Sequence, residues 1–580
     1  MFAIRKITFG MKKKFIFFTI LTPLLMFGEV FLETVIPYLM SLIIDKGIQN
    51  RDTSCVIQIG ITMLLCALIS LCFGAGGALT AACASQGFSR ALRQNLFSKI
   101  QTFSFVNIDK FSSASLITRL TTDVTNLQNV YQLLIRICFR SPFMLISGTT
   151  MAFIINARLA VIFLIAIPVL GSVIIIVSTV AYSRFAKMLK KYDRLNSVVQ
   201  ENLIAIRIVK AFVRGEYECE KFEEAAEAVK NAQVRAEKLV IVLMPVMQTV
   251  VYSSIISIFW FGGKLTVSGN LQPGELVSFL TYVSQIFMSL MMLEMVFVSV
   301  ILSRASMNRV VEVLDEKPSI KESAENPVED IRDGSIEFEN VSFTYTEQKD
   351  NNVLADISFH IESGESIGII GGTGSSKSTL ISLIPRLYDV SKGSVKVSGV
   401  DVKNYSIAAL RKEIAVVPQK NILFSGTIRE NLLWGNDTAS EQELVSACEA
   451  SNADSFINTF TSQYDTVLEP GGTNLSGGQK QRLCIARALL KDSKILILDD
   501  SLSAVDTATE ASILKNLFKF KPEMTKIIIA HRISAVQNAD RIIVLDEGRI
   551  SGIGSHSELL QSCAVYKELY DSQKSICLEG

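Results

Sequence analysis

Six long apolar stretches occupy the first half of this chain, and they constrain its fold more than any other feature. They lie at about 15–44, 55–84, 128–156, 159–183, 239–263 and 274–303. Each reaches or exceeds the ~20 residues that an α-helix needs to cross a bilayer. Hydrophobic residues make up 49% of the 580 residues, which is too many for an ordinary soluble protein of this length. The sequence therefore predicts an all-α membrane domain with six transmembrane helices.

The basic start of the chain, Met1–Lys14, leads directly into the first stretch and could be interpreted as part of a signal peptide. The apolar stretch from about Phe15 to Ile44 is longer than the apolar region of a signal peptide, and five more stretches follow it. We interpret it instead as the first transmembrane helix.

The connections between the stretches alternate between short and long. The N-terminus and the two long connections, 85–127 and 184–238, carry 22 Lys and Arg residues, whereas the three short connections carry four. Positive charge accumulates on the cytosolic side, so both termini and both long connections are expected in the cytosol. The long connections have few Pro or Gly residues and a helical apolar pattern. Their turns, near 106–114 and 212–217, are candidate couplers to a cytosolic domain; the alternative is a helical hairpin lying on lipid.

Charge separates the two halves of the chain. Residues 1–310 hold 30 Lys and Arg against 17 Asp and Glu, and residues 311–580 hold 27 against 39. A basic apolar half followed by an acidic polar half indicates a membrane domain followed by a cytosolic domain. A polar segment with two prolines marks the boundary. The predicted organisation is a membrane domain at 1–314, a linker at 315–334 and a cytosolic domain at 335–580.

Beyond the linker, short β-branched runs alternate with helical stretches. The runs are Ser335–Phe343, Ser366–Ile370, Ile414–Val417, Lys494–Asp499, Lys526–Ala530 and Arg541–Leu545. This alternation predicts a largely parallel sheet flanked by helices.

A Gly-rich segment follows the second of these runs and opens a helix. It reads Gly371, Gly372, Thr373, Gly374, Ser375, Ser376, Lys377, Ser378, Thr379. This is the context of a phosphate-binding loop, in which backbone N–H groups wrap the phosphates, Lys377 meets the β- and γ-phosphates and Ser378 binds Mg²⁺. The pattern expects Gly directly before the lysine, where this chain has Ser376. If that position needs a positive φ, serine costs roughly 1–2 kcal/mol there.

Two further motifs accompany the loop. The apolar run Ile495–Leu498 ends in Asp499 and Asp500, and Asp499 at the tip of a buried strand can hold a Mg²⁺ shell. The second motif begins Leu475, Ser476, Gly477, Gly478, Gln479 and continues to Arg482. It would lie at a helix N-terminus, where the Ser476 side chain and the glycine backbone can grip a γ-phosphate.

Together these three motifs resemble the ATPase cassette of ATP-binding cassette (ABC) transporters. With the six apolar stretches, the resemblance covers nearly the whole chain and is closest to bacterial half-transporter exporters of the multidrug type. It implies an α/β P-loop NTPase domain, ATP and Mg²⁺ as cofactors, and export of amphipathic small molecules, drugs or lipids, across the plasma membrane. The implied partners are membrane lipid, the transported molecule and a second half-transporter chain; no nucleic acid is implied.

The resemblance also implies roles for single residues. Tyr345 matches the aromatic residue that stacks on adenine, and Gln419 matches the residue that senses Mg²⁺ and contacts the membrane helices. The segment Ser503–Asp506 matches the loop that crosses the dimer interface. His531 matches the switch histidine near the γ-phosphate.

Asp500 stands where the family normally has the glutamate that polarises the attacking water. A carboxylate drawn back by more than 1 Å can lose on the order of 10²-fold in rate; the alternative is that Asp500 simply works. In this family the signature at Ser476–Gln479 acts on ATP held by the other cassette. The resemblance and the two departures, Ser376 and Asp500, therefore favour a heterodimer in which this chain's own site is slow. A homodimeric exporter or lipid flippase, and an importer or regulatory subunit, remain alternatives.

Charged residues inside the apolar stretches are costly and mark candidate functional sites. Glu294 lies near the middle of the sixth stretch, and Glu29 and Glu33 share one face of the first. They are candidates for a substrate cavity, and the cluster Met288, Met291, Met292 and Met295 would add an adaptable apolar surface. Arg136 and Arg140 in the third stretch could equally form structural ion pairs with the glutamates.

Overall fold

The computed structural model describes residues 10–321, 327–345 and 352–579. The chain divides into two compact units, Met1–Thr102 with Phe111–Glu316, and Phe103–Lys110 with Lys317–Gly580. Part of the linker predicted at 315–334, residues 322–326, lies outside the described residues, as do residues 1–9.

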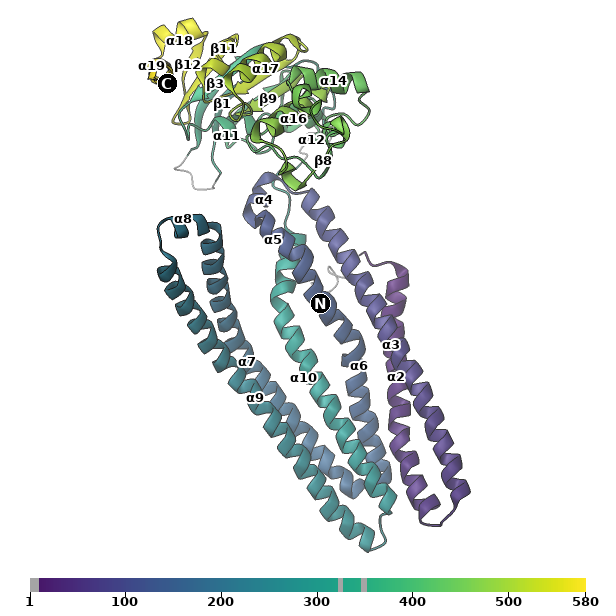
Figure 1. Cartoon of the computed structure of the whole chain (residues 1–580). Helices are drawn as coiled ribbons and strands as arrows, with labels where there is room; N and C mark the ends of the chain where they lie inside the picture. The colour runs from purple at the N-terminus through teal and green to yellow at the C-terminus, as the bar shows by residue number, and fades with distance from the viewer. Residues whose placement is uncertain (1–9, 322–326, 346–351, 580) are drawn as a thin grey trace. The chain divides into compact units, whose positions relative to one another are not determined.

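Six long helices build the first unit and correspond to the six predicted stretches (Figure 1). They are α2 (Lys13–Leu42, continued by the π-helix η1, Ile43–Ile48), α3 (Thr53–Gln101), α6 (Val124–Ile155), α7 (Ala157–Ile204), α9 (Gly215–Val267) and α10 (Pro273–Asp315). All six are long and apolar enough to cross a membrane. The 53 residues of α9 span roughly 80 Å, far more than the ~30 Å hydrocarbon core of a bilayer. The predicted extension of the helices beyond the membrane is therefore present.

Side-chain caps and cross-helix contacts fix the short connections of this unit. The Asp52 carboxylate accepts from the backbone N–H groups of Ser54 and Cys55 at the start of α3, and Asn156 caps α7 in the same way. The Asp45 carboxylate accepts a hydrogen bond from the N–H of Gly274, the second residue of α10 (2.7 Å). The two caps fix the starts of α3 and α7, and the Asp45–Gly274 contact holds the start of α10 against η1.

Short helices form the ends of the two long connections. The first connection contains α4 (Phe105–Phe111), α5 (Ser113–Thr118) and the π-helix η2 (Arg119–Asp123), and the second contains α8 (Ile206–Ala211). Most of α4 belongs to the second unit, where Tyr388 donates to the Asp109 carboxylate (2.9 Å) and the Asn107 amide donates to the Lys317 carbonyl (3.1 Å). Of the turn predicted near 106–114, residues 106–110 thus lie in a helix of that unit, while 111–114 belong to the first unit and include the start of α5.

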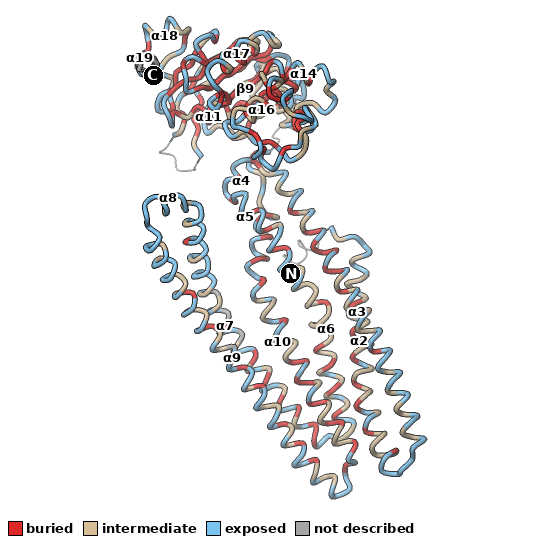
Figure 2. Tube along the Cα trace, in the orientation of Figure 1, coloured by how far each residue is buried: buried red, intermediate tan, exposed pale blue. Residues whose placement is uncertain are grey.

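The second unit contains a six-stranded sheet in the order β12-β11-β3-β10-β9-β6. Its strands are β3 (Ser366–Gly371), β6 (Ile414–Val417), β9 (Ile495–Asp499), β10 (Thr525–Ile529), β11 (Arg541–Asp546) and β12 (Arg549–Gly554). All neighbouring pairs are parallel except β11 with β12. Every residue of β3, β9 and β10 is buried, which explains their continuous apolar sequence (Figure 2).

A second sheet is antiparallel, in the order β2-β1-β4-β5. Its strands are β1 (Ile336–Phe343), β2 (Leu354–Ile361), β4 (Lys392–Val397) and β5 (Val400–Asp401); β7 (Gly426–Thr427) and β8 (Val467–Leu468) form a separate pair. The prediction that the run at 335–343 joins the parallel sheet was wrong. That run pairs with β2 and β4, whose partly polar sequences were not recognised as strands.

Helices complete the second unit. They are α11 (Lys377–Ser382), α12 (Ile407–Lys412), α13 (Ile428–Leu433), α14 (Glu441–Ala450), α15 (Asp454–Ile457), α16 (Gly477–Leu490), α17 (Thr507–Lys519), α18 (His556–Ser562) and α19 (Ala564–Glu579). The predicted fold class, a six-helix membrane domain followed by an α/β domain, is confirmed.

Candidate ATP-binding site

The Gly-rich loop connects β3, near the middle of the parallel sheet, to α11. A Cβ atom at Gly371 would lie 2.1 Å from the carbonyl oxygen of Leu545, so only glycine fits at the start of the loop. Gly374 has φ +87° and Ser376 has φ +70°, so both lie in the left-handed region. The backbone at Ser376 therefore requires the conformation that glycine adopts at least cost.

Lys377 lies inside the loop and is buried. Its ammonium donates to the carbonyl oxygens of Gly371 and Gly372 (both 2.8 Å) and to the Ser375 hydroxyl (3.2 Å). Burial lowers the pKa of Lys377, while the carboxylates of Asp500 and Asp499 oppose that shift. The lysine charge is thus held beside two carboxylates, at the point where phosphates would enter.

Ser378 and Asp499 meet across the site, because the Ser378 hydroxyl donates to the Asp499 carboxylate (2.9 Å). Ser378 is in α11 and Asp499 is the last residue of β9. Asp499 is 8% exposed, and burial raises its pKa. A hydroxyl and a carboxylate oxygen are the ligand types that Mg²⁺ prefers, so this pair fits the ion that accompanies ATP.

Asp500 and His531 line one cavity of about 110 Å³. Asp500 follows β9 and His531 follows β10, and the carboxyl ends of adjacent parallel strands lie at one edge of a sheet. The Asp500 N–H donates to the Ile529 carbonyl (3.0 Å), which fixes the backbone between the two strands. The Gln573 amide donates to the His531 carbonyl (2.8 Å) and holds the histidine segment from α19.

A second acidic side chain in this cavity was missed from the sequence. Glu510 of α17 lines the cavity with Asp500, is 5% exposed and accepts from Arg532 (3.3 Å). Burial raises the pKa of Glu510, and the Asp500 carboxylate adds to the rise while Arg532 opposes it. In the sequence, Glu510 reads as an ordinary acidic residue in the first turn of a helix. That reading gave no reason to place it in the site.

Tyr345 lies beside the loop, where its hydroxyl and that of Thr379 are 3.0 Å apart. Its ring packs edge-on against Phe343 (4.8 Å between centroids) and Tyr388 (5.2 Å). Tyr345 is 51% exposed, as a residue that stacks on a ligand has to be. Gln419 is exposed and follows β6, the strand next to β9; its carbonyl accepts from Asn421 (3.3 Å).

The signature forms the start of α16. Ser476 is its N-cap: the hydroxyl accepts from the Gln479 N–H (3.3 Å) and the Gln479 side chain accepts from the Ser476 N–H (2.9 Å). Ser476 and Gly477 are exposed. Gln481, which the sequence did not single out, is 4% exposed and ties α16 to the loop at Ser503–Asp506 through the Ala504 N–H (3.0 Å).

The structure therefore assembles two parts of the predicted site separately. Lys377, Ser378, Asp499 and Tyr345 are joined through the phosphate loop, and Asp500 and His531 share the neighbouring cavity. Among the described residues, no contact is recorded between these groups and Ser476 or Gly477.

The charged residues of the membrane helices fall into two groups. Arg140 of α6 pairs with Glu33 (2.7 Å) and approaches Glu29 (3.6 Å), both in α2. Glu294 of α10 is half-buried and makes no recorded hydrogen bond or ion pair with the described residues. The ion-pair interpretation therefore describes Arg140 with Glu29 and Glu33, whereas neither Arg136 nor Glu294 forms an ion pair among the described residues.

Residues 19–290 match the family described as ABC transporter transmembrane region, and residues 354–503 match the family described as ABC transporter. An uncharacterised ABC transporter ATP-binding protein of Bacillus subtilis, YfiB, is 38% identical over 95% of both chains. The ATP-dependent lipid A-core flippase of Desulfotalea psychrophila is 34% identical over 84% of this chain and 85% of its own length.

Among solved structures, a bacterial Atm1-family ABC exporter with ATP bound superimposes with a TM-score of 0.82 at 25% identity. The match covers 96% of this chain and 98% of that chain, so it includes both units. The two family matches, the relatives of equal length and the shared fold agree. This chain belongs to the ABC transporter family, as an exporter-type half-transporter that fuses one transmembrane region to one ATP-binding domain.

Proposed function

We propose that this chain is the degenerate-site half of a heterodimeric exporter that moves amphipathic small molecules across the plasma membrane. The observation that carries this proposal is the pair of departures at its own ATP site. Ser376 adopts φ +70°, a conformation that costs a non-glycine residue roughly 1–2 kcal/mol. Asp500 brings a carboxylate one methylene shorter than glutamate to the cavity that it shares with His531.

The two departures affect different steps at one site. Ser376 places a side chain on the loop that surrounds the phosphates, directly before Lys377. Asp500 supports the attacking water less well, because general-base catalysis depends on reach to within hydrogen-bond distance. Mg²⁺ held by Ser378 and Asp499 would neutralise phosphate charge. The site is therefore expected to bind ATP and to hydrolyse it slowly.

The signature supports an active role for this chain in a second site. Ser476 and Gly477 are exposed, and the helix that they start is 14 residues long and has a capping box at its N-terminus. Exposed N–H groups at a helix N-terminus suit a phosphate. We infer that the signature completes the site of the partner chain, where most ATP is hydrolysed.

A second surface also fits a two-chain assembly. The end of the α7–α8–α9 hairpin has no buried residue in α8, and Phe212 and Val213 are 74% and 87% exposed (Figure 2). The ATP-binding unit carries its own exposed apolar patch, in which Phe424 and Trp434 stack at 4.3 Å. Such patches mark protein interfaces. We propose that, in the dimer, the hairpin end of one chain packs against the Phe424–Trp434 patch of the other chain.

A cavity between α9 and α10 supports a proposal for the substrate class. It measures about 330 Å³, within the range of small-molecule sites, and its lining includes Met244, Met247, Met288 and Met291. Gln248 and Tyr252 add a polar pair, joined by a 3.1 Å hydrogen bond. Glu294 lies three residues after Met291 on the same side of α10. Methionine adapts to varied apolar shapes, and the isolated carboxyl favours a positive charge. We propose amphipathic cations as substrates.

One specific observation favours a second candidate, a homodimeric lipid flippase. The Desulfotalea psychrophila relative is a lipid A-core flippase, and it matches 84% of this chain. A lipid would use the same apolar cavity without needing the charge at Glu294.

Co-expression of two differently tagged copies of this chain with its genomic neighbours tests the assembly. Sequential purification on both tags should recover little protein, whereas purification on one tag should yield this chain and a second half-transporter in equal amounts. Efficient recovery of both tags together would contradict the heterodimer and favour the homodimeric flippase. Transport of a lipophilic cation and of a labelled lipid in inside-out vesicles would then separate the two substrate classes.

A further inference from the structure

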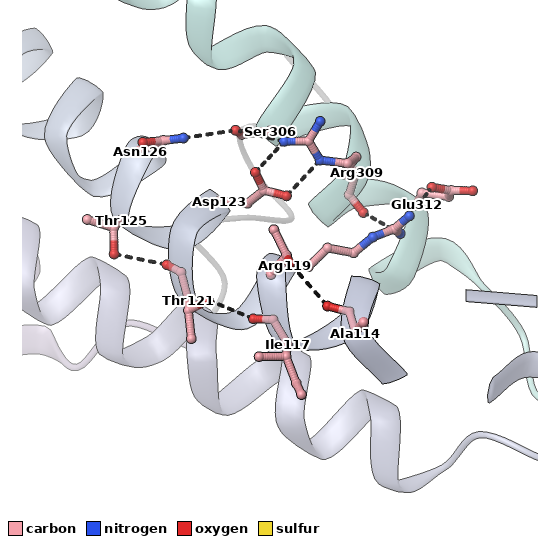
Figure 3. Close-up of polar contacts among 11 residues, drawn as sticks. Ala114, Ile117, Arg119, Thr121, Asp123, Thr125, Asn126, Ser306, Arg309 and Glu312 are labelled. Carbon is pink, nitrogen blue, oxygen red and sulfur yellow. Dashed lines mark hydrogen bonds and ion pairs between the residues drawn. The ribbon is translucent and has the colours of Figure 1, made fainter. Parts of the chain in front are cut away.

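An ion pair between a buried carboxylate, Asp123, and a partly exposed arginine, Arg309, connects the segment before α6 to the end of α10 (Figure 3). Asp123 is fully buried, and its two carboxylate oxygens accept from the Nε of Arg309 (2.8 Å) and from a terminal nitrogen of the same guanidinium. Paired parallel bonds of this kind fix the direction as well as the distance between two side chains. Ser306, one turn before Arg309, also accepts from the Asn126 amide (3.3 Å).

Arg119 adds a second crossing between the same segments. Its guanidinium donates to the Arg309 carbonyl (2.9 Å) and pairs with Glu312 (3.0 Å). It also lies 4.7 Å from the ring centre of Phe111 and is 8% exposed. Figure 3 shows the side chains of η2 and those of α10 facing one another where the two segments meet. We call Arg119, Asp123, Arg309 and Glu312 the junction clamp.

The junction clamp lies close to both points at which the chain passes between the two units. The chain passes from the ATP-binding unit to the membrane unit at Lys110–Phe111, and it returns at Glu316–Lys317. The clamp joins the segments directly after the first crossing and directly before the second. Arg119 and Asp123 are the ends of a π-helix, an irregularity that is often found at functional sites.

Stability alone is a poor explanation for such a pair. Burying the Asp123 carboxylate costs hydration energy that its attraction to Arg309, whose side chain is 45% exposed, is needed to offset, so little net stability remains. What the pair does supply is a fixed register between two helices. That property matters where movement has to pass from one unit to the other.

We propose that the junction clamp makes the two crossings move as one body and so transmits nucleotide-driven movement of the ATP-binding unit to the membrane helices. Asp123 and Arg309 are positioning residues, since neither belongs to the ATP site. The inference requires only that the chain is an ABC exporter, and it holds for an identical or a different partner.

Hydrogen exchange on the intact dimer in nanodiscs tests this without knowledge of the substrate. The nonhydrolysable analogue AMP-PNP with Mg²⁺ should slow exchange in the phosphate loop, Gly371–Thr379, and should change exchange in the connection Ser268–Gln272 before α10. In Asp123→Asn, the protection of the phosphate loop should persist and the response at Ser268–Gln272 should be lost. Asp123→Glu retains the carboxylate and should recover part of that response.

Glu227→Gln is the matched control, because the Lys230–Glu227 pair (2.9 Å) lies within α9 and joins no two elements. It should leave both responses unchanged. If Asp123→Asn does not fold, Arg309→Lys keeps the charge but loses the two-pronged contact, and the same split is expected. An unchanged response at Ser268–Gln272 in a folded clamp variant would overturn the proposal, as would equal losses at both segments.

Discussion

The Asp499 carboxylate is well placed to bind Mg²⁺, but its negative charge is unfavourable because the group is buried. Its carboxylate accepts from Ser378, but burial raises its pKa and the Asp500 carboxylate adds to the rise. A raised carboxyl pKa means that the protonated form is favoured in the folded protein. The contribution of Asp499 to the free energy of unfolding is therefore complete below its ordinary pKa. It is lost as the pH rises through the raised pKa of the folded protein. The charge is therefore held at a cost that a bound cation offsets.

Asp499→Asn should accordingly raise the melting temperature of the nucleotide-free protein, more at neutral than at mildly acidic pH. The same variant should lose most of the stabilisation that ATP with Mg²⁺ gives the native protein, since a ligand stabilises only the state that binds it. Differential scanning fluorimetry at both pH values measures this. A lower melting temperature of the nucleotide-free variant at neutral pH would contradict the inference that the buried charge on Asp499 destabilises the protein.

Some roles of single residues could be predicted from the sequence, and others could not. The spacing of Ser378 and Asp499 within a strand–loop–helix pattern was sufficient to predict Mg²⁺ ligands, and the structure records their contact. Whether serine is unfavourable at position 376 depends on the φ angle there, and only the structure supplies that angle. Glu510 and Gln481 escaped notice because their positions depend on packing between α16, α17 and the loop between them.

At the scale of elements, the sequence predicted the long helices well, because hydropathy and helix length follow from composition. The antiparallel sheet was harder, since β2 and β4 pair with β1 from distant positions and bury only part of their surface. The break of the first long connection into α4, α5 and η2 was also missed. In this connection, α4 is held by contacts within the ATP-binding unit, Ser112 caps α5, and η2 contacts α10.

The topology of the helices can be tested at the connection between α9 and α10. Gly269 would be the natural position for a label, but its φ of +75° would strain a cysteine there. Ser268→Cys avoids this, because Ser268 is exposed and has φ −79°. In a variant without other exposed cysteines, a membrane-impermeant maleimide should label it from outside intact cells. Labelling only after the membrane is opened would reverse the predicted orientation.

The cavity between α9 and α10 makes a prediction about substrate charge. Glu294→Gln should weaken transport of a lipophilic cation roughly tenfold, about what the loss of one contact to a charged group of ~1.5 kcal/mol produces. Transport of a neutral compound of similar size should fall much less, and basal ATP hydrolysis should survive. Glu33→Gln is the comparison, because Glu33 is engaged by Arg140 (2.7 Å). Equal losses for both compounds with a lower melting temperature would favour a structural role for Glu294.

At the scale of the whole molecule, the proposed assembly gives the chain half of each of two ATP sites. Its phosphate loop, Asp499 and Asp500 belong to one, and its exposed signature is expected to belong to the other. The departures at Ser376 and Asp500 fall on the first, and the capped signature helix is intact. An ABC exporter with this distribution should hydrolyse ATP mainly at the site that the partner chain begins.

The most direct test compares two substitutions in the purified complex. Ser476→Phe should remove most ATP hydrolysis, since a bulky side chain at the helix N-terminus blocks the γ-phosphate of the partner's site. Ser440→Phe controls for loss of a helix cap, because Ser440 caps α14 with the same hydrogen bonds. Asp500→Asn should reduce the rate by less than about twofold, although loss of a working catalytic carboxylate costs on the order of 10²-fold or more. Loss of turnover in Asp500→Asn alone would make this chain's own site the working one and would contradict the division of labour proposed for the two sites.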